Sequence, residues 1–338
     1  MSPNQGQLPL IEMLRRDGVV SADARLEPLS GGISSEIFLI VDAGPLRVVK
    51  RALRQLRVVD AWIANVSRND FEQRYLKYVS HFMPDSVPAV LASGNGYFVM
   101  PYFDSAYATW KSYLLEGVAR PEDAQEAGRF LGCVHEHSSN DAEAAMQFDS
   151  GENFRQLRID PYLRTVARRH PEVDDIIRAE ADRLAKWREC LVHGDYSPKN
   201  MLLNGHRLVV LDCEVAWYGD PAFDLAFLIS HLLLKALFHA PRDVGLQQLA
   251  QAFVAWYLQS RRLARGEQVT LLARTSTLAC ILLLARVDGK SPVEYLDQAR
   301  QEVVRSFTIP ALQAWPSNDP RELCEQWFRH LETVISPV

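Results

Sequence analysis

The sequence predicts a bilobal α+β protein with a small strand-rich N-terminal lobe and a larger helical C-terminal lobe. Strand signals dominate residues 26–100, and helical patterns dominate from about residue 119 onward. One β-rich insert, at residues 192–215, interrupts the helical part. A strand-rich first third followed by a helical remainder is typical of an α+β architecture. We therefore place an N-terminal domain at residues 1–103 and a C-terminal domain at residues 104–338.

Composition is that of an ordinary globular protein. With 338 residues, 48% of them hydrophobic and 23% charged, the chain is long enough for two domains. The formal net charge of −5 argues against a general nucleic-acid binder, which carries a basic surplus. No apolar run reaches the roughly 20 residues of a membrane helix, and the N-terminus lacks signal-peptide features. We expect a cytoplasmic protein that binds neither nucleic acid nor membrane, with reduced cysteines. The oligomeric state is left open.

Residue patterns predict the main elements in order along the chain. Strands are expected at Glu36–Val41, Leu46–Lys50 and Gly96–Met100, each bounded by Gly, Pro or Asn. Long helices are expected at Glu122–Glu136, Pro221–Phe238, Gln247–Arg262 and Val269–Ala285.

A further helix lies between the second and third strands. Ser67 and Asp70 form a capping box that predicts a helix start at about Arg68. Within this helix Glu72 shares its face with apolar residues three, four and seven positions later, so its carboxylate points inward. A buried carboxylate needs a positive partner, because desolvating it alone is costly. Lys50, at the end of an apolar strand, is the expected partner.

The most informative stretch is a β-hairpin with polar residues at both open ends. His193-Gly194-Asp195 and Asn200 come before its first strand, the Asn204-Gly205 dipeptide predicts the tight turn, and Asp212 follows the second strand. The two ends of a hairpin converge in space. Phosphoryl transfer needs a carboxylate to orient a hydroxyl and oxygen ligands to hold magnesium. The spacing matches kinase catalytic loops, with Asp195 as the base and Asn200 and Asp212 as metal ligands.

These motifs, taken together, resemble the aminoglycoside phosphotransferase and choline kinase-like small-molecule kinases, which share a protein-kinase-like fold. The resemblance rests on His193-Gly194-Asp195 with Asn200, on Leu211-Asp212-x-Glu214, and on Gly219-Asp220-Pro221-x-x-Asp224-Leu225-Ala226. Protein kinases carry Arg, Lys and Gly where this chain has Gly194, Ser197 and Glu214. The resemblance implies a kinase that uses Mg²⁺ and ATP, with GTP left open as the donor. An atypical protein kinase and a non-catalytic nucleotide-binding pseudokinase are the alternatives.

The resemblance also implies roles for residues outside the hairpin. In the first lobe it assigns the phosphates to a glycine turn and to an ion pair, and the adenine edge to an inter-lobe hinge at residues 97–103. Glu214 would assist through a second ion or a bound water. Asp220 and Asp224 are expected to brace the catalytic loop rather than bind metal. The implied nucleotide-binding residues are Gly31, Gly32, Ser34, Ser35, Lys50, Glu72, Met100 and Tyr102.

The acceptor is expected to be a small molecule with a hydroxyl group: an antibiotic, a sugar, an amino alcohol or another metabolite. Candidate contacts are Arg286 and Asp288, which follow a long apolar helix, with a solvated helix end as the alternative. Trp217 and Tyr218, just after the metal-binding motif, are candidates too, with core packing as their alternative. The sequence leaves the identity of the acceptor open.

Overall fold

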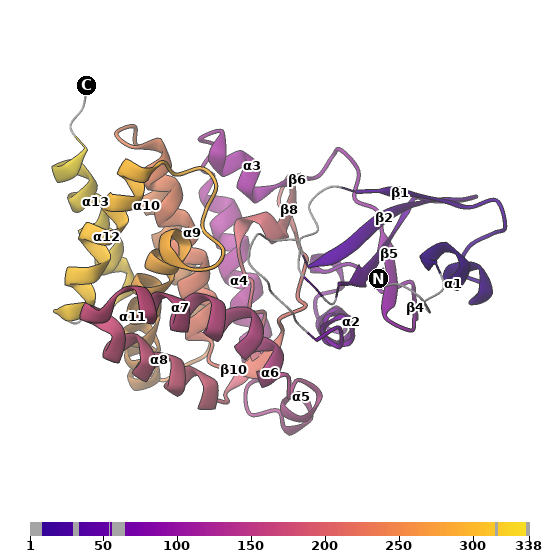
Figure 1. Ribbon diagram of the computed structural model, residues 1–338, viewed down its shortest axis with the longest axis horizontal. Helices are drawn as coiled ribbons and strands as arrows, with labels where there is room; N and C mark the ends of the chain where they lie inside the picture. Colours follow the sequence, from indigo (N-terminus) through magenta and orange to yellow (C-terminus); the bar gives the residue numbers. More distant parts are fainter. Residues whose placement is uncertain (1–8, 30–33, 54, 56–64, 315–316, 336–338) are drawn as a thin grey trace, which may run out of the picture. The chain divides into compact units, whose positions relative to one another are not determined.

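The computed structural model describes residues 9–29, 34–53, 55, 65–314 and 317–335 (Figure 1). The chain divides into Met1–Ala106, here called unit 1, and Tyr107–Val338, here called unit 2. The boundary predicted from the sequence lies between residues 103 and 104.

Unit 1 is built on a five-stranded antiparallel sheet with strand order β1-β2-β3-β5-β4. Its core joins helix α1 to the sheet through Leu14, Ile40, Val49 and Tyr97. In the register of this sheet Lys50 of β3 lies between Ile37 of β2 and Phe98 of β5. The strands are β1 (Arg25–Pro28), β2 (Ser35–Val41), β3 (Arg47–Ala52), β4 (Ala92–Gly94) and β5 (Tyr97–Pro101), and the helices are α1 (Leu10–Arg16), α2 (Arg68–Ser80) and the short η1 (Pro84–Ser86).

Helix α2 begins at the predicted residue, Arg68, but Ser67 does not cap it as predicted. Ser67 already has helical dihedral angles (φ −57°, ψ −16°), and its side chain makes no capping hydrogen bond. A capping residue needs extended dihedral angles to reach the free N–H groups of the first turn. The inward face of the helix is as predicted, because Glu72, Tyr75, Leu76 and Val79 are all buried.

Unit 2 combines two small sheets with a large set of helices. One sheet pairs β7 (Cys190–Val192) with β10 (Trp217–Gly219), and the other has the order β6 (Ala108–Thr109), β8 (Met201–Asn204), β9 (Arg207–Val210). The helices are α3 (Trp110–Leu115), α4 (Pro121–Ser138), α5 (Ala142–Gln147), α6 (Gly151–Phe154), η2 (Arg155–Arg164), α7 (Thr165–Arg169), η3 (Pro171–Val173), α8 (Asp174–Lys186), η4 (Pro198–Asn200), α9 (Ala222–His239), α10 (Leu246–Ser260), α11 (Arg265–Asp288), α12 (Gln298–Gln313) and α13 (Pro320–Val334).

The predicted hairpin is present as β8 and β9, with its turn one residue later than expected. Leu203 pairs with Leu208 and Asn204 with Arg207, so Gly205 and His206 are the two loop residues. Gly205 takes the positive φ of 58°, which glycine adopts without the steric cost of a side chain.

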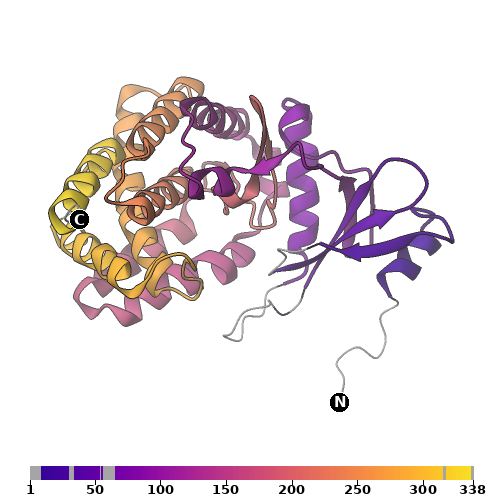
Figure 2. The same ribbon diagram turned by 90° about the horizontal axis from the view of Figure 1, so that it is seen from above.

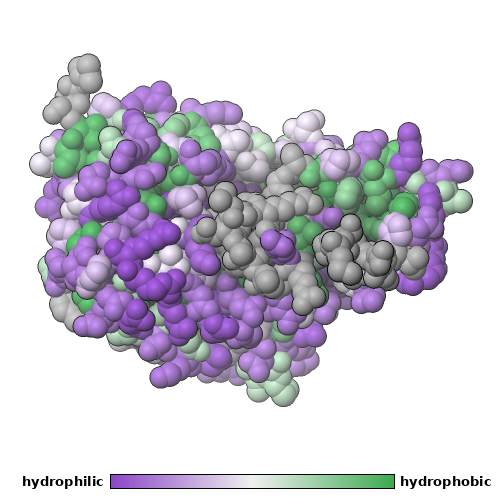
Figure 3. Space-filling view, viewed as in Figure 1, coloured by the Kyte–Doolittle hydropathy of each residue, from purple (hydrophilic) through white to green (hydrophobic). Residues whose placement is uncertain are grey.

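In unit 2, α10 packs against α4 and α9, and α11 packs against α9. Figure 2 shows the helices of this unit from above. α9 and α11 are each long and apolar enough to cross a membrane, but their most apolar windows are 89% and 67% buried inside the protein. Core helices of globular domains pass the same test, so this is weak evidence for a membrane span. The face drawn in Figure 3 is mostly hydrophilic where its residues are described.

Candidate active site

The hairpin brings the predicted polar residues together at its open end. Asn200 closes the short helix η4 immediately before β8, and its carbonyl oxygen accepts a hydrogen bond of 2.8 Å from the N–H of Leu211, immediately after β9. Asp195 precedes the same helix, and Asp212 follows Leu211. Backbone pairing therefore fixes the separation of the two segments, one on each side of the hairpin.

Asp195 is buried and bound on both carboxylate oxygens. Its Oδ1 lies 2.9 Å from Nη2 of Arg158, and its Oδ2 lies 2.9 Å from Nζ of Lys199 and 2.8 Å from Nδ2 of Asn200. Burial alone would raise the pKa of Asp195, but the positive charges of Lys199 and Arg158 outweigh it and lower the pKa. The carboxylate is therefore ionised and held in one orientation.

The remaining polar atoms form an oxygen-rich set. Nδ2 of Asn200 is engaged by Asp195, so the amide oxygen is the atom that could bind a metal. Carboxylate oxygens of Asp212 and Glu214 lie within 4.8 Å of each other. Asp212 also has a φ of 61°, a left-handed conformation that is uncommon for a residue with a side chain. Strained dihedral angles of this kind cluster at functional sites. Two carboxylates and an amide oxygen fit a hard cation such as Mg²⁺.

Side chains from other helices hold the loop that carries Asp195. Asp224 of α9 accepts hydrogen bonds from the backbone N–H groups of His193 (2.7 Å) and Gly194 (2.9 Å). The ring of His193 contacts the N–H of Asp195 and the carbonyl oxygen of Leu211, at 3.1 Å each. Burial lowers the pKa of His193, which keeps its ring neutral. The predicted bracing role fits these contacts of Asp224.

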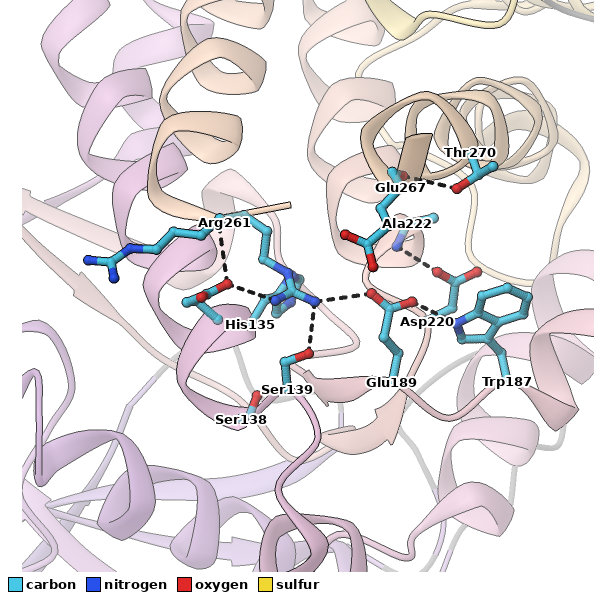
Figure 4. Close-up of polar contacts among 12 residues, drawn as sticks. His135, Ser138, Ser139, Trp187, Glu189, Asp220, Ala222, Arg261, Glu267 and Thr270 are labelled. Carbon is cyan, nitrogen blue, oxygen red and sulfur yellow. Dashed lines mark hydrogen bonds and ion pairs between the residues drawn. The ribbon is translucent and has the colours of Figure 1, made fainter. Parts of the chain in front are cut away.

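A polar network anchors the strand that leads into this loop (Figure 4). The buried guanidinium of Arg261 contacts Glu189 and Ser139, at 3.1 Å each, and Glu189 immediately precedes β7. The N–H of Leu191 in β7 donates to Oγ of Ser138 at 2.9 Å. Asp220 was predicted to brace the catalytic loop, but its described contacts lie elsewhere. Its carboxylate instead binds two arginines and the start of α9: Arg183, Arg274 and the N–H of Ala222.

In unit 1 the predicted ion pair is present. Nζ of Lys50 lies 2.8 Å from Oε1 of Glu72, and both side chains are almost fully buried. The strand register and the inward face of α2 together place this pair, as the helical periodicity predicted. A buried pair of this geometry fixes the position of the lysine ammonium.

Of the other predicted nucleotide contacts, the structure describes Ser34, Ser35, Met100 and Tyr102. Gly31 and Gly32 lie outside the described residues. The carbonyl oxygen of Ser34 accepts from the N–H of Leu53 at 2.8 Å, and Ser35 is buried at the start of β2. Met100 is half-buried in β5. The N–H of Tyr102 donates to Leu46 at 3.2 Å, so this amide is used within unit 1.

Residues 25–266 match the phosphotransferase enzyme family described under the name APH. The chain belongs to this family. The match covers most of unit 1 and the whole hairpin. The family resemblance seen in the motifs is therefore confirmed.

Similar proteins agree with this assignment. A methylthioribose kinase of Pectobacterium atrosepticum is 29% identical over 257 residues, covering 67% of this chain and 64% of the relative. A methylthioribose kinase of Yersinia pseudotuberculosis is 27% identical over 300 residues, covering 77% of this chain and 74% of the relative. An amicoumacin kinase solved with AMP-PNP and Ca²⁺ has a TM-score of 0.60 at 12% identity, covering 93% of this chain and 96% of that one. Its likeness confirms the predicted fold class.

Among the predicted acceptor contacts of this phosphotransferase-family chain, the aromatic pair lies in the core. The ring of Trp217 is 1% exposed and stacks on Phe154 with centroids 3.8 Å apart. Tyr218 is also buried, and its hydroxyl contacts the carbonyl oxygen of Ser138 at 3.2 Å. Core packing, the alternative given for both residues, accounts for these contacts. We therefore do not include them in the site.

The two charged candidates differ from each other. Asp288 is bound by Arg305 through two 2.8 Å contacts and by His170 at 2.8 Å, so its charge holds the end of α11 to α12 and to the residue after α7. Arg286 makes no ion pair with any described carboxylate; its Nη1 contacts the hydroxyl of Tyr162 at 3.2 Å and Ser291. Arg286 therefore remains a candidate, and Asp288 is structural.

Sequence reasoning missed Arg158 and Lys199, which both bind the carboxylate of Asp195. Lys199 lies inside the catalytic segment and could have been found by its four-residue spacing from Asp195. Arg158 lies in η2, a π-helical segment, and no local pattern marks it. π-Helical turns occur often at functional sites, but the sequence does not reveal them.

Proposed function

We propose that this protein is an ATP-dependent phosphotransferase that moves the γ-phosphate to a hydroxyl group of a small molecule. The observation that carries the proposal is the position of Asp195, bound by Arg158 and Lys199, beside the oxygen-rich set of Asn200, Asp212 and Glu214. The chain spans 64% of the length of the methylthioribose kinase of Pectobacterium atrosepticum. That relative and the AMP-PNP-bound amicoumacin kinase support kinase chemistry without naming the acceptor of this chain.

Asp195 is the group proposed to act on the acceptor. Its ionised carboxylate accepts the hydrogen bond of the hydroxyl and takes the proton as the oxygen–phosphorus bond forms. The bond between the γ-phosphorus and the β–γ bridging oxygen breaks, and ADP leaves with that electron pair. Because the pKa of Asp195 is lowered, it is a weak base, and its main contribution is orientation.

Asn200, Asp212 and Glu214 are proposed to hold Mg²⁺, which neutralises charge on the nucleotide phosphates when bound. The backbone hydrogen bond from Leu211 to Asn200 keeps the segments that carry these oxygen atoms next to each other at the open end of the hairpin. In unit 1 the Lys50–Glu72 pair is proposed to present the lysine ammonium to the α- and β-phosphates. Gly31, Gly32, Ser34 and Ser35 are proposed to contact the same phosphates.

An acceptor screen with Mg²⁺ and ATP tests this proposal. Purified protein should release ADP when the right small molecule is present, and Asp195→Asn should slow that release about 10²–10⁴-fold while still binding AMP-PNP. Generic protein mixtures should not be phosphorylated. Phosphorylation of protein mixtures would favour an atypical protein kinase, and nucleotide binding without turnover on a broad screen would favour a non-catalytic module.

A further inference from the structure

A second group of polar side chains lies inside unit 2, on helices the kinase motifs do not include. Helix α9 presents Phe227, His231 and Lys235 at four-residue intervals, which places them along one face of the helix. Helix α11 packs along α9, and Arg286 lies in its last turn. We call His231, Lys235 and Arg286 the basic cluster.

The hydrogen-bond donors in and beside the basic cluster are only partly satisfied, although Nη1 of Arg286 donates to Tyr162 and Ser291. Lys235 is 1% exposed, and its ammonium makes one hydrogen bond of 3.4 Å, to the carbonyl oxygen of His231. Nε of Arg286 and the hydroxyl of nearby Tyr295 are buried without a hydrogen-bond partner in the part of the chain that is described. Tyr295 places its ring 5.4 Å from the ammonium of Lys235. Buried donors are almost always paired in folded proteins, so these two unpaired groups beside a lysine with one long hydrogen bond indicate a ligand.

The charges around the cluster are mostly positive. Burial, followed by the charges of Lys111 and Arg286, lowers the pKa of Lys235 to about 7. Burial, followed by Lys235, Arg286, Lys199 and Lys111, lowers the pKa of His231 well below its usual value. The acidic group that acts on Lys235 is Glu294, and its carboxylate already pairs with Lys111. A negative charge would therefore be strongly favoured at this position.

Aromatic side chains connect the basic cluster to Asp195. The guanidinium of Arg158, which binds Asp195, lies 5.5 Å from the ring of Tyr162 and 5.6 Å from that of Phe227. On one branch, the hydroxyl of Tyr162 accepts from Arg286 at 3.2 Å. On the other, the ring of Phe227 lies 5.1 Å from that of His231. On each branch, a single aromatic side chain therefore separates Arg158 from a member of the basic cluster.

We infer that His231, Lys235 and Arg286 form the subsite for an acidic group of the phosphate acceptor, so that the acceptor is a small hydroxylated anion. This inference rests on the proposed function and names its substrate class. Carboxylates, phosphate esters and sulfate esters share the required charge. Along α9, His231 and Lys235 lie roughly 6 and 12 Å beyond Phe227, at 1.5 Å per residue.

The cluster argues against a cationic acceptor. An aminoglycoside or an amino alcohol would bring positive charge beside Lys235 and Arg286, with the nearby Glu294 already paired. Because His231 and Lys235 are buried, the acidic group must also belong to a small molecule rather than to a protein surface.

Anion binding to the nucleotide-loaded protein tests the subsite without knowledge of the acceptor. With Mg²⁺ and AMP-PNP saturating, sulfate or succinate should raise the melting temperature of the wild-type protein more than sodium chloride of equal ionic strength. Sulfate represents phosphate and sulfate esters, and succinate represents carboxylates. Lys235→Met should weaken the apparent Kd about 10- to 100-fold, as expected for losing a hydrogen bond to a charged group. Lys290→Met, the same change two residues beyond α11, should bind anions like the wild type.

The outcomes separate this inference from the proposed function. Equal anion binding by wild type and Lys235→Met, or no stabilisation beyond that of chloride, would overturn the subsite even if nucleotide binds. If the wild-type protein binds no nucleotide but still binds anions in a way that depends on Lys235, the kinase proposal is overturned and the anion subsite is not. In the acceptor screen, the compounds that cause the protein to release ADP from ATP should carry an acidic group. A best acceptor that is neutral or cationic would also overturn the inference.

Discussion

Nη2 of Arg158 lies 2.9 Å from Oδ1 of Asp195, and Nε of the same guanidinium donates to the carbonyl oxygen of Gly194 at 2.6 Å. One buried side chain therefore holds both the carboxylate and the backbone of the catalytic loop. Because arginine is charged at every accessible pH, this contact keeps Asp195 ionised as well as oriented. Arg158 acts through Asp195 and is a positioning residue.

Arg158→Met should lower kcat about 10- to 100-fold, the size expected from losing one or two hydrogen bonds to a charged group. Binding of Mg²⁺ and AMP-PNP should change little, because the guanidinium makes its contacts to the loop through Asp195 and Gly194. Steady-state kinetics and isothermal titration measure the two effects. Arg155→Met, whose partners Glu152 and Asp160 lie at the surface, is the matched control. A variant with normal kcat would refute the positioning role.

Local patterns were sufficient to predict the hairpin and the Lys50–Glu72 pair. The hairpin depends on a glycine turn between two apolar strands, and its spacing fixes which residues meet at the open end. The ion pair depends on helical periodicity, which places Glu72 on the buried face of α2. Both features are set by residues within one or two elements, which is why the sequence alone revealed them.

Long-range packing decided what the sequence could not predict. Arg158 meets Asp195 only because η2 folds back beside the catalytic loop, and no spacing encodes that contact. Trp217 and Tyr218 looked like substrate contacts from their position after the metal motif, but pairing of β10 with β7 takes them into the core. The basic cluster did leave a signal in the sequence, because His231 and Lys235 stand four residues apart in a mostly apolar helix. Their relation to Arg286 required the packing of α11 on α9.

The Lys50–Glu72 pair should matter more for nucleotide binding than for folding when both charges are removed together. Lys50→Met or Glu72→Met alone removes one charge of this buried pair and should destabilise unit 1 by about 3–5 kcal/mol. The double variant removes both charges of the pair and should recover most of that stability while still binding AMP-PNP poorly. Urea unfolding and nucleotide titration of the three proteins measure this. Asp70→Met, on the same helix, is the control. Tight nucleotide binding by the double variant would contradict the assigned role.

The two central aspartates should respond differently to substitution. Asp195→Asn keeps the shape and removes the base, so it should bind Mg²⁺ and ATP almost normally and lose about 10²–10⁴-fold in kcat. Asp212→Asn removes a charged metal ligand and should also weaken the magnesium dependence of nucleotide binding. Isothermal titration of ATP with and without Mg²⁺ separates the cases. If Asp195→Asn alone loses metal-dependent binding, the two roles are reversed.

A chelator should abolish turnover, and Mg²⁺ or Mn²⁺ should restore it, because the proposed ligands are all oxygen atoms. Zn²⁺ should restore it poorly, since the described part of this site offers no thiol or imidazole ligand. The measurement is ADP release after chelation and metal addition. Full activity in chelator would exclude the assignment of Asn200, Asp212 and Glu214 as metal ligands.

Lys235 should make the stability of the protein depend on pH. Its pKa is lowered to about 7 in the folded protein from an ordinary value of 10.5, first by burial and then by Lys111 and Arg286. Between these two values the unfolded chain binds a proton that the folded protein does not, so the free energy of unfolding rises with pH. Below about pH 7 both forms are protonated, and the cost of the buried charge is fully present. Glu294 partly offsets that cost, and His231, which faces the same charges, stays neutral.

Lys235→Met removes this cost and should therefore be more stable than the wild type near pH 6, by an amount on the order of a few kcal/mol. The difference should shrink as the pH approaches 10, where the wild-type lysine is neutral. Urea unfolding of both proteins at pH 6, 7.5 and 9.5 measures the difference, with Lys290→Met as the control. Sulfate should reduce the advantage of the variant at pH 6, because an anion beside Lys235 stabilises its charged form. A stability difference that is independent of pH would show that Lys235 is not the buried, destabilised charge that the structure places at this position.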